Sequence, residues 1–152
     1  METALRILLV ENNSTDQIAI QRLFQPESLG YDLETAGSLS QAKEYLGASA
    51  YDLILLDYNL GDGTGLELFQ HITDTPVVFI AGSHTEEVII EAMKAGAYDF
   101  LIKDPYMGYL SLIASTIEKV MKRKHAEDKL NRYLVELKRS NEELKLCVCG
   151  FA

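Results

Sequence analysis

Two carboxylates and one lysine lie far apart in the sequence, yet each follows an apolar run of the kind that forms a buried strand. Glu11, Asp57 and Lys103 occupy these positions, and Asn12 directly follows Glu11. If the runs are parallel strands of one sheet, their carboxyl ends share one edge, which is where open α/β sheets bind ligands. Carboxylate and amide oxygens suit Mg²⁺, and a carboxylate can attack phosphorus to form an aspartyl phosphate. The metal ion and the ammonium would offset charge on the transferring phosphoryl group.

The elements that must position these residues begin with short apolar runs. The expected strands cover residues 7–10, 31–36, 53–56, 77–80 and 100–102, of which 31–36 is the weakest. The strongest runs are apolar at successive positions, as strands covered on both faces are. The sequence therefore predicts a sheet that is buried between two layers.

Helical patterns fill the gaps between these strands. Ser14 is expected to cap a helix that ends before Pro26, and Ser38 is expected to cap one that stops at Gly47. Two more helices are expected over residues 65–72 and 86–95. With a fifth helix after the last strand, the alternation predicts an α/β protein with an open parallel (βα)5 sheet and helices on both faces.

The chain beyond residue 108 has a different pattern, with no proline or glycine before Gly150. Its first turns are expected to pack on the sheet as the fifth helix, and a heptad pattern follows. The expected seam consists of Leu130, Leu134, Leu137, Asn141 and Leu144. Asn141 is the one polar residue of this seam, which favours a single register and a two-stranded coiled coil.

Three segments are therefore expected. Residues 1–108 form a compact core, and residues 109–146 form one long helix that continues as a dimeric coiled coil. Residues 147–152 form a C-terminal end and a candidate truncation point. The alternative for the second segment is a solvated amphipathic tail.

Charge and composition exclude several classes of protein. The net charge of −9 argues against a nucleic-acid-coating protein, although residues 1–108 carry −12 and residues 109–152 carry +3. The basic tail mixes in acids and lacks interleaved aromatics, so no nucleic-acid site is expected there. No run of about 18 apolar residues and no secretory signal occurs, so no membrane span is expected. With Cys147 and Cys149 read as reduced thiols, the expected location is the cytoplasm.

Four ordered stretches of the sequence carry a family resemblance. They read LRILLVENNSTD, YDLILLDYNLGDGTGLEL, PVVFIAG and EAMKAGAYDFLIKD. Together they resemble the receiver domain of response regulators in two-component signalling, over residues 5–108. The resemblance implies a five-stranded flavodoxin-like fold that is phosphorylated on an aspartate.

The resemblance also implies a role for each matching residue. Asp57 matches the aspartate that accepts the phosphoryl group, and Lys103 matches the lysine that contacts this group. Glu11 and Asn12 match the acidic pair near Mg²⁺. Asp57 and the backbone carbonyl of Asn59 match the remaining protein ligands of the metal ion.

Two positions depart from the family pattern. Asn12 stands where the family usually has a metal-binding aspartate, so the expected Mg²⁺ site is weak. Ala81 replaces the usual threonine or serine of the switch, and an alanine donates no hydrogen bond to a phosphoryl oxygen. Ser83 and Thr85 are the alternative hydroxyls in the following loop. Phe100 matches the switching aromatic residue.

The expected function is that of a phosphorelay receiver. It takes a phosphoryl group from the phosphohistidine of a histidine kinase or phosphotransfer protein onto Asp57, and it signals through a homodimeric coiled coil. Such a receiver is not a turnover enzyme beyond its own phosphorylation and dephosphorylation. The alternative, prompted by Asn12 and Ala81, is a degenerate receiver that serves as a phosphorylation-independent dimerisation or docking module.

The tail carries a second, shorter resemblance. Its segment SNEEL, with the coil that precedes it, is similar to the helix that leads into the dimerisation domain of sensor histidine kinases. This resemblance implies the N-terminal part of a larger signalling protein, a hybrid sensor histidine kinase or a receiver-coil regulator.

Overall fold

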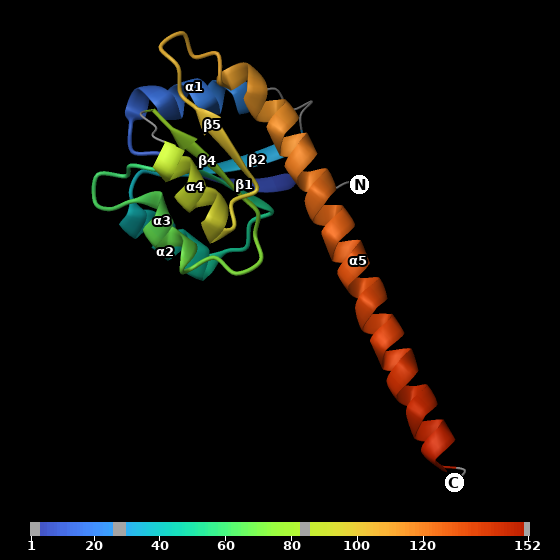
Figure 1. Cartoon of the computed structure of the whole chain (residues 1–152). Coiled ribbons are helices and arrows are strands. Elements are labelled where there is room, and N and C mark those ends of the chain that lie inside the picture. Colours follow the sequence, from blue (N-terminus) through green and yellow to red (C-terminus); the bar gives the residue numbers. More distant parts are fainter. Residues whose placement is uncertain (1–3, 26–29, 83–85, 151–152) are drawn as a thin grey trace. The chain divides into compact units, whose positions relative to one another are not determined.

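A computed structural model describes residues 4–25, 30–82 and 86–150, with side chains described as far as residue 145. Within these ranges, five strands alternate with five helices (Figure 1). The strands are β1 (Leu5–Val10), β2 (Tyr31–Ala36), β3 (Leu53–Asp57), β4 (Val77–Ala81) and β5 (Asp99–Ile102). The helices are α1 (Ser14–Phe24), α2 (Leu39–Ala48), α3 (Gly65–Phe69), α4 (Glu86–Ala95) and α5 (Leu110–Gly150).

The five strands form one parallel sheet in the order β2-β1-β3-β4-β5. β3 lies at its centre, where Leu55 pairs with Leu9 of β1 and with Val78 of β4. This is the flavodoxin-like order, and the predicted fold class is confirmed. The order changes direction between β1 and β3, so the carboxyl ends of these two strands lie side by side at the edge where such folds bind ligands.

Helices on both faces of the sheet explain why the strands are apolar at successive positions. Figure 1 shows α2, α3 and α4 on one side of the sheet and α1 on the other. Leu8 of β1 and Phe79 of β4 belong to a buried cluster that includes Leu39 of α2 and Leu68 of α3. Because side chains alternate along a strand, Ile7 points to the opposite face, and it is also fully buried.

Two expected helix ends are wrong by one residue. The N-cap of α1 is Asn13 rather than Ser14, because the Asn13 side chain accepts a hydrogen bond from the backbone N–H of Asp16 at 3.1 Å. The expected cap of α2, Ser38, is confirmed, but that helix continues one residue beyond Gly47.

The third helix is shorter than the apolar pattern predicts. It ends at Phe69 instead of reaching residue 72. The backbone N–H of His71 donates to the carbonyl of Leu68 at 2.9 Å, which is a tight turn in place of helical bonding.

The chain divides into two compact units, Met1–Val120 and Met121–Ala152, and the boundary between them falls within helix α5. It begins at Leu110 and continues past residue 146 to Gly150, so the backbone at Cys147 and Cys149 is helical. Their side chains fall outside the described part of the chain. None of the described helices is both long and apolar enough to cross a bilayer.

Candidate functional site

The carboxyl ends of four strands surround one pocket. β1 ends next to Glu11, β3 ends at Asp57, β4 ends at Ala81, and β5 is followed by Lys103. The pocket is lined by Glu11, Asn12, Asn13, Asp16, Asp57, Tyr58, Asn59, Thr64, Ala81, Gly82, Val88 and Lys103. The site residues expected from strand ends therefore lie together at one rim of the sheet.

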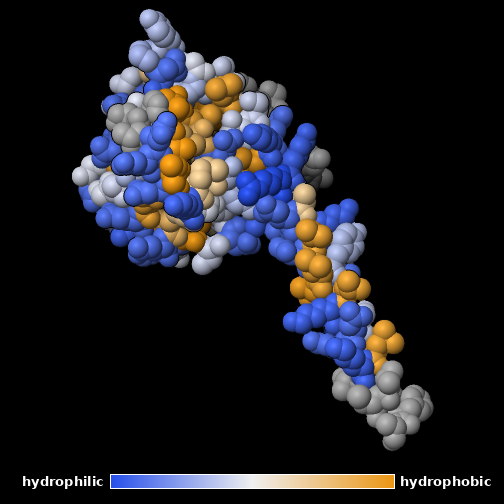
Figure 2. Space-filling model, in the orientation of Figure 1, coloured by the Kyte–Doolittle hydropathy of each residue, from blue (hydrophilic) through white to orange (hydrophobic). Residues whose placement is uncertain are grey.

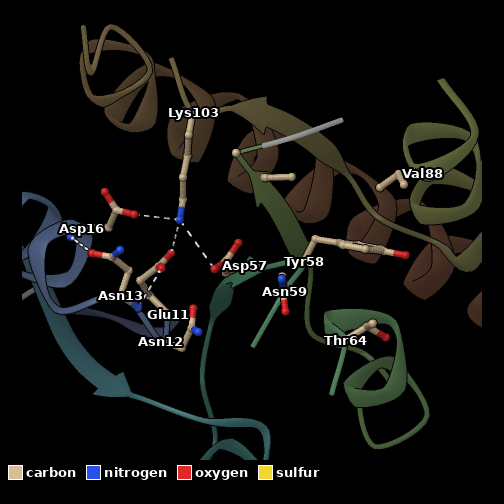
Figure 3. A pocket seen from close by; sticks show the side chains of 12 residues that line it. Glu11, Asn12, Asn13, Asp16, Asp57, Tyr58, Asn59, Thr64, Val88 and Lys103 are labelled. Carbon is tan, nitrogen blue, oxygen red and sulfur yellow. Dashed lines mark hydrogen bonds and ion pairs between the residues drawn. The ribbon is translucent and has the colours of Figure 1, made fainter. Parts of the chain in front are cut away.

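The ammonium group of Lys103 joins the acids of this pocket (Figure 3). Its Nζ atom lies 2.7 Å from Oε2 of Glu11, 3.0 Å from Oδ2 of Asp16 and 3.5 Å from Oδ2 of Asp57. The Glu11 side chain is fully buried and that of Asp57 is 8% exposed. One ammonium is thus shared by three carboxylates whose side chains are largely buried.

The loop between β1 and α1 holds two of these acids in place. The backbone N–H of Asn13 donates to Oε1 of Glu11 at 3.1 Å, and the side-chain amide of Gln17 donates to the Glu11 carbonyl. The Asn13 cap then begins α1 so that Asp16 lies in its first turn. Asp16 reaches the Lys103 ammonium from this turn, opposite Asp57 (Figure 3).

A glycine-dependent turn holds Asp57. A Cβ atom at Gly65 would lie 2.7 Å from the backbone oxygen of Asp57 and 2.8 Å from the ring of Phe79, so no larger residue fits there. Gly61 has a φ of +82°, a conformation that side chains other than hydrogen disfavour. The glycines around residues 61–65 therefore build the tight connection from β3 to α3.

Burial governs the electrostatics of the pocket. It raises the pKa of Glu11 to about 7, against the lowering effect of the hydrogen bond from Lys103. Burial also raises the pKa of Asp57, and the nearby Lys103 charge opposes this in part. Burial alone would lower the pKa of Lys103, but its hydrogen bond to Glu11 and the charges of Asp57 and Glu11 raise it. The ionised carboxylates are costly here, so a further cation would stabilise them.

The oxygen atoms of the pocket fit a hard cation such as Mg²⁺. Asp57 supplies a carboxylate, Asn12 an amide, and Asn59 also lines the pocket. In the described part of the chain, no three or more His, Cys, Asp or Glu side chains are placed to hold a metal ion by themselves. Mg²⁺ does not require such a group, because it usually takes one or two carboxylates and keeps several waters.

The expected switch positions lie at and beside the pocket. Ala81 is 2% exposed and lines the pocket. As expected, this position presents a methyl group to the pocket and no hydroxyl. Ser83 and Thr85 lie outside the described residues. Phe100 is half-buried, and its ring stacks on that of Phe79 with the centroids 6.5 Å apart.

The expected seam residues of the tail lie in the second unit. The side chains of Leu130, Leu134, Leu137 and Leu144 are all exposed, and so is Asn141. Figure 2 shows apolar side chains at the surface of this part of α5. They take no part in the pocket.

Two residues near the Lys103 ammonium escaped the sequence analysis. Asp16 contacts Lys103 directly, and Tyr109 is 97% buried within range of the same charges. Neither residue follows a strand, because Asp16 lies on α1 and Tyr109 immediately precedes α5. The spacing of Asp16 from the N-cap Asn13 is the signal that could have found it, because it places the acid in the first helical turn.

Comparisons with known proteins agree with this geometry. A family model for the response regulator receiver domain matches residues 7–112. The response regulator protein PilR of Pseudomonas aeruginosa is 38% identical over 89 residues, covering 56% of this chain and 20% of PilR. The alginate biosynthesis transcriptional regulatory protein AlgB of the same species is 37% identical over 116 residues, covering 72% of this chain and 25% of AlgB. The chain thus spans a quarter or less of the length of these curated relatives.

Solved structures share the fold. The receiver domain of a putative LuxO repressor from Vibrio parahaemolyticus matches with a TM-score of 0.73 and 24% identity, covering 84% of this chain and 97% of that one. A fusion that contains the yeast Spc42 trimeric coiled coil matches with a TM-score of 0.74 and 26% identity, covering 97% of this chain and 99% of that one. The second match extends along nearly the whole chain.

Proposed function

This chain belongs to the response regulator receiver domain family, and from this premise we propose that Asp57 accepts a phosphoryl group. Receivers of two-component systems interact with histidine kinases or phosphotransfer proteins, and the proposed donor is a phosphohistidine of such a partner. The observation that carries the proposal is the ion pair of 3.5 Å between Oδ2 of Asp57 and Nζ of Lys103 inside a pocket of strand ends. The donor group would enter this pocket from its open side.

The proposed transfer needs little from the protein beyond position and charge. A carboxylate oxygen of Asp57 attacks phosphorus, the bond from phosphorus to the imidazole nitrogen breaks, and the electron pair remains on that nitrogen. Lys103 carries the positive charge that offsets the phosphoryl oxygens, and its raised pKa keeps it protonated. No net proton has to be taken up by the pocket.

Receiver domains generally bind Mg²⁺ at their acidic pocket, and the proposed ligands here are Asp57, Asn12 and the backbone carbonyl of Asn59, with Glu11 beside them. The bound ion would supply positive charge to the phosphoryl oxygens. Asn12 brings no charge, so we expect weak Mg²⁺ binding. Ala81 offers no hydroxyl to a phosphoryl oxygen, so we expect a weak conformational response in the loop that follows β4.

Incubation with acetyl phosphate and Mg²⁺, followed by a phosphate-affinity gel, tests the proposal. We expect a shifted band for the native chain and none for Asp57→Asn. Asp32→Asn is the matched control, because it removes an exposed aspartate of β2 and should leave the shift intact. An unshifted native chain, beside a known receiver that shifts, would contradict phosphorylation.

That negative result would favour a second candidate function, a docking module that works without phosphorylation. The specific observations in its favour are the neutral Asn12 and the methyl group of Ala81 in the pocket. The partner specificity of such a module should be the same for the native chain and for Asp57→Asn.

We further propose that the tail forms a homodimeric coiled coil. The apolar side chains of the seam are 54–62% exposed in the single chain, and burying them requires a partner. A second copy of the same helix offers the matching heptads, and Asn141 favours two strands over three. The coil in the similar Spc42 fusion is trimeric, so the number of strands has to be measured.

Sedimentation equilibrium over a range of concentrations tests the dimer. We expect a reversible dimer for the native chain and a monomer for Leu137→Glu, whereas Lys138→Glu, an exposed neighbour, should still dimerise. A trimer would contradict the assigned role of Asn141, and a monomer at every concentration would contradict the coil.

The proposed context is a longer signalling protein. The curated relatives are response regulators of which this chain spans a quarter or less, and the SNEEL segment of the tail favours a histidine kinase domain after the coil. The reading frame beyond Ala152 distinguishes a response regulator with an output domain from a hybrid histidine kinase. A dimerisation domain with a phosphorylatable histidine would support the hybrid kinase, and a transcriptional output domain would contradict it.

A further inference from the structure

Asp16 is a third carboxylate in the pocket, and the family resemblance assigned no role to it although it ends the stretch LRILLVENNSTD. Its Oδ2 atom lies 3.0 Å from Nζ of Lys103, closer than the 3.5 Å that separates Lys103 from Asp57. Its side chain is 18% exposed, so solvent screens this pair only in part. Asp16 is therefore a direct partner of Lys103 in the resting structure.

The substitution at Asn12 suggests a role for the contact between Asp16 and Lys103. Asn12 occupies the position of a usual aspartate, and the substitution removes one negative charge from the rim of the pocket. Asp16 lies on the next turn of the chain and faces the same pocket. Glu11, Asp16 and Asp57 together bring three carboxylates to one ammonium.

The charge of Asp16 also acts on a buried neighbour, Tyr109. The hydroxyl of Tyr109 is buried without a hydrogen-bond partner in the structure. Burial raises the pKa of Tyr109 to about 12, and the charge of Asp16 is the next largest cause. The negative charge of Asp16 is thus felt across a poorly solvated region, where electrostatic interactions are stronger than in water.

We propose that Asp16 is a positioning residue that supplies the charge missing at Asn12: it holds Lys103 on the α1 side of the pocket and keeps the pocket negative enough to bind a divalent cation beside Asp57. This inference rests on the proposed receiver function only in that both use the same pocket. After phosphoryl transfer to Asp57, the new phosphoryl oxygens would compete with Asp16 for the Lys103 ammonium. Asp16 itself forms no bond to phosphorus.

Binding of Mn²⁺ alone, followed by the electron paramagnetic resonance signal of the free ion, tests the proposal without any phosphoryl donor. We expect Asp16→Asn to weaken Mn²⁺ binding by about tenfold, the lower end of the effect usual for residues that orient metal ligands. Asp16→Glu should retain most of the affinity. Glu44→Gln, which removes the same charge from an exposed position on α2, should leave the affinity unchanged.

The decisive variant moves the charge back to the position that the family uses. The loss of Mn²⁺ affinity caused by Asp16→Asn is therefore measured in the native chain and in an Asn12→Asp background. If Asp16 supplies the charge missing at position 12, the loss should be smaller in the Asn12→Asp background, whereas a purely structural role of Asp16 predicts the same loss in both. Thermal unfolding of each variant shows that the fold is kept.

Three results would overturn the proposal: unchanged affinity in Asp16→Asn, an equal loss from Asp16→Asn in the native and Asn12→Asp backgrounds, or no Mn²⁺ binding by the native chain. Failure of the proposed function looks different, because Mn²⁺ would bind as expected while Asp57 took up no phosphoryl group.

Discussion

The two parts of α5 follow the same rules of helix formation but differ in where their apolar side chains lie. Up to Val120 the helix buries Ile113 and Ile117 completely. From Met121 onward, Leu134 and Leu137 are 54% and 60% exposed. A continuous helix therefore does not imply a continuous core, because helix formation is local whereas burial needs a second surface.

The ion pairs of the two units of the chain, Met1–Val120 and Met121–Ala152, also differ. The Lys103 ammonium is 13% exposed and joins three acids from distant parts of the chain. Arg139 and Glu143 of the tail are 81% and 68% exposed and lie one helical turn apart. The first arrangement depends on the whole fold, whereas the second supports only its own helix.

The largest expected effect is a difference in the free energy of unfolding between two side-chain truncations, one in each part of α5. Ile117→Ala should lower the free energy of unfolding of the first unit, Met1–Val120, here called the sheet domain, by about 2–5 kcal/mol. The reason is that the truncation leaves a cavity in the core. Leu137→Ala should leave that free energy unchanged within about 0.5 kcal/mol. Urea unfolding, followed by hydrogen exchange of the β3 amides, measures this stability in both variants.

Equal losses in the two variants would break the comparison, because they would mean that the tail and the sheet domain unfold as one unit. Unfolding is measured at concentrations where the chain is monomeric, so that dissociation of the proposed coil does not contribute to the free energy of unfolding.

The buried acid of the pocket should make the stability of the sheet domain depend on pH. Since the folded state raises the pKa of Glu11 to about 7, it holds a proton that the unfolded chain has already released above its ordinary value of 4.5. The free energy of unfolding should therefore fall as pH rises from 4.5 through 7, by at most about 3 kcal/mol. Glu11→Gln should reduce this fall, and the part that remains belongs to Asp57, whose pKa burial also raises.

Urea unfolding at pH 5 and pH 8, with a chelator to remove divalent cations, checks this prediction. The tail offers the control, since Glu143→Gln removes an exposed acid and should leave the pH dependence as it is in the native chain. A fall of equal size in Glu11→Gln would assign the effect to other groups.

The polar residue of the seam should have a smaller effect, confined to the tail. Asn141→Leu should tighten the proposed dimer by about tenfold, about 1.4 kcal/mol, because an apolar residue replaces a polar one between the helices. It should also loosen the preference for two strands. Sedimentation equilibrium measures both effects, and an unchanged distribution of species would contradict the position of Asn141 in the seam.

The exposed ion pairs of the tail should matter least. Arg139→Ala should change the stability of its helix by about 0.5 kcal/mol or less, because the pair with Glu143 is solvated and spans 3.5 Å. Circular dichroism during thermal unfolding checks this. A large loss would show that the pair belongs to an interface.

The sheet could be predicted from sequence because its strands are buried on both faces, which leaves unbroken apolar runs such as residues 53–56. The exact helix ends could not, since Asn13 and Ser14 are both capable caps and only the hydrogen bond to Asp16 distinguishes them. The end of α3 was missed because apolar spacing does not separate a helix from the turn at His71.

The pocket was predictable to the extent that its residues lie at strand ends. Glu11, Asp57 and Lys103 follow strands, so the topology alone brings them together. Asp16 reaches the same ammonium from a helix, and its approach depends on the cap that precedes it. A side chain placed by such tertiary detail leaves no periodic signal in the sequence.

Chemical trapping of the phosphoryl group tests the central claim most directly. After exposure to acetyl phosphate and Mg²⁺, reduction with borohydride converts an aspartyl phosphate to homoserine, which peptide mass spectrometry locates. We expect homoserine at position 57 alone, and none in Asp57→Asn. Homoserine at another acid of the pocket, or none in the native chain beside a known receiver that is labelled, would contradict it.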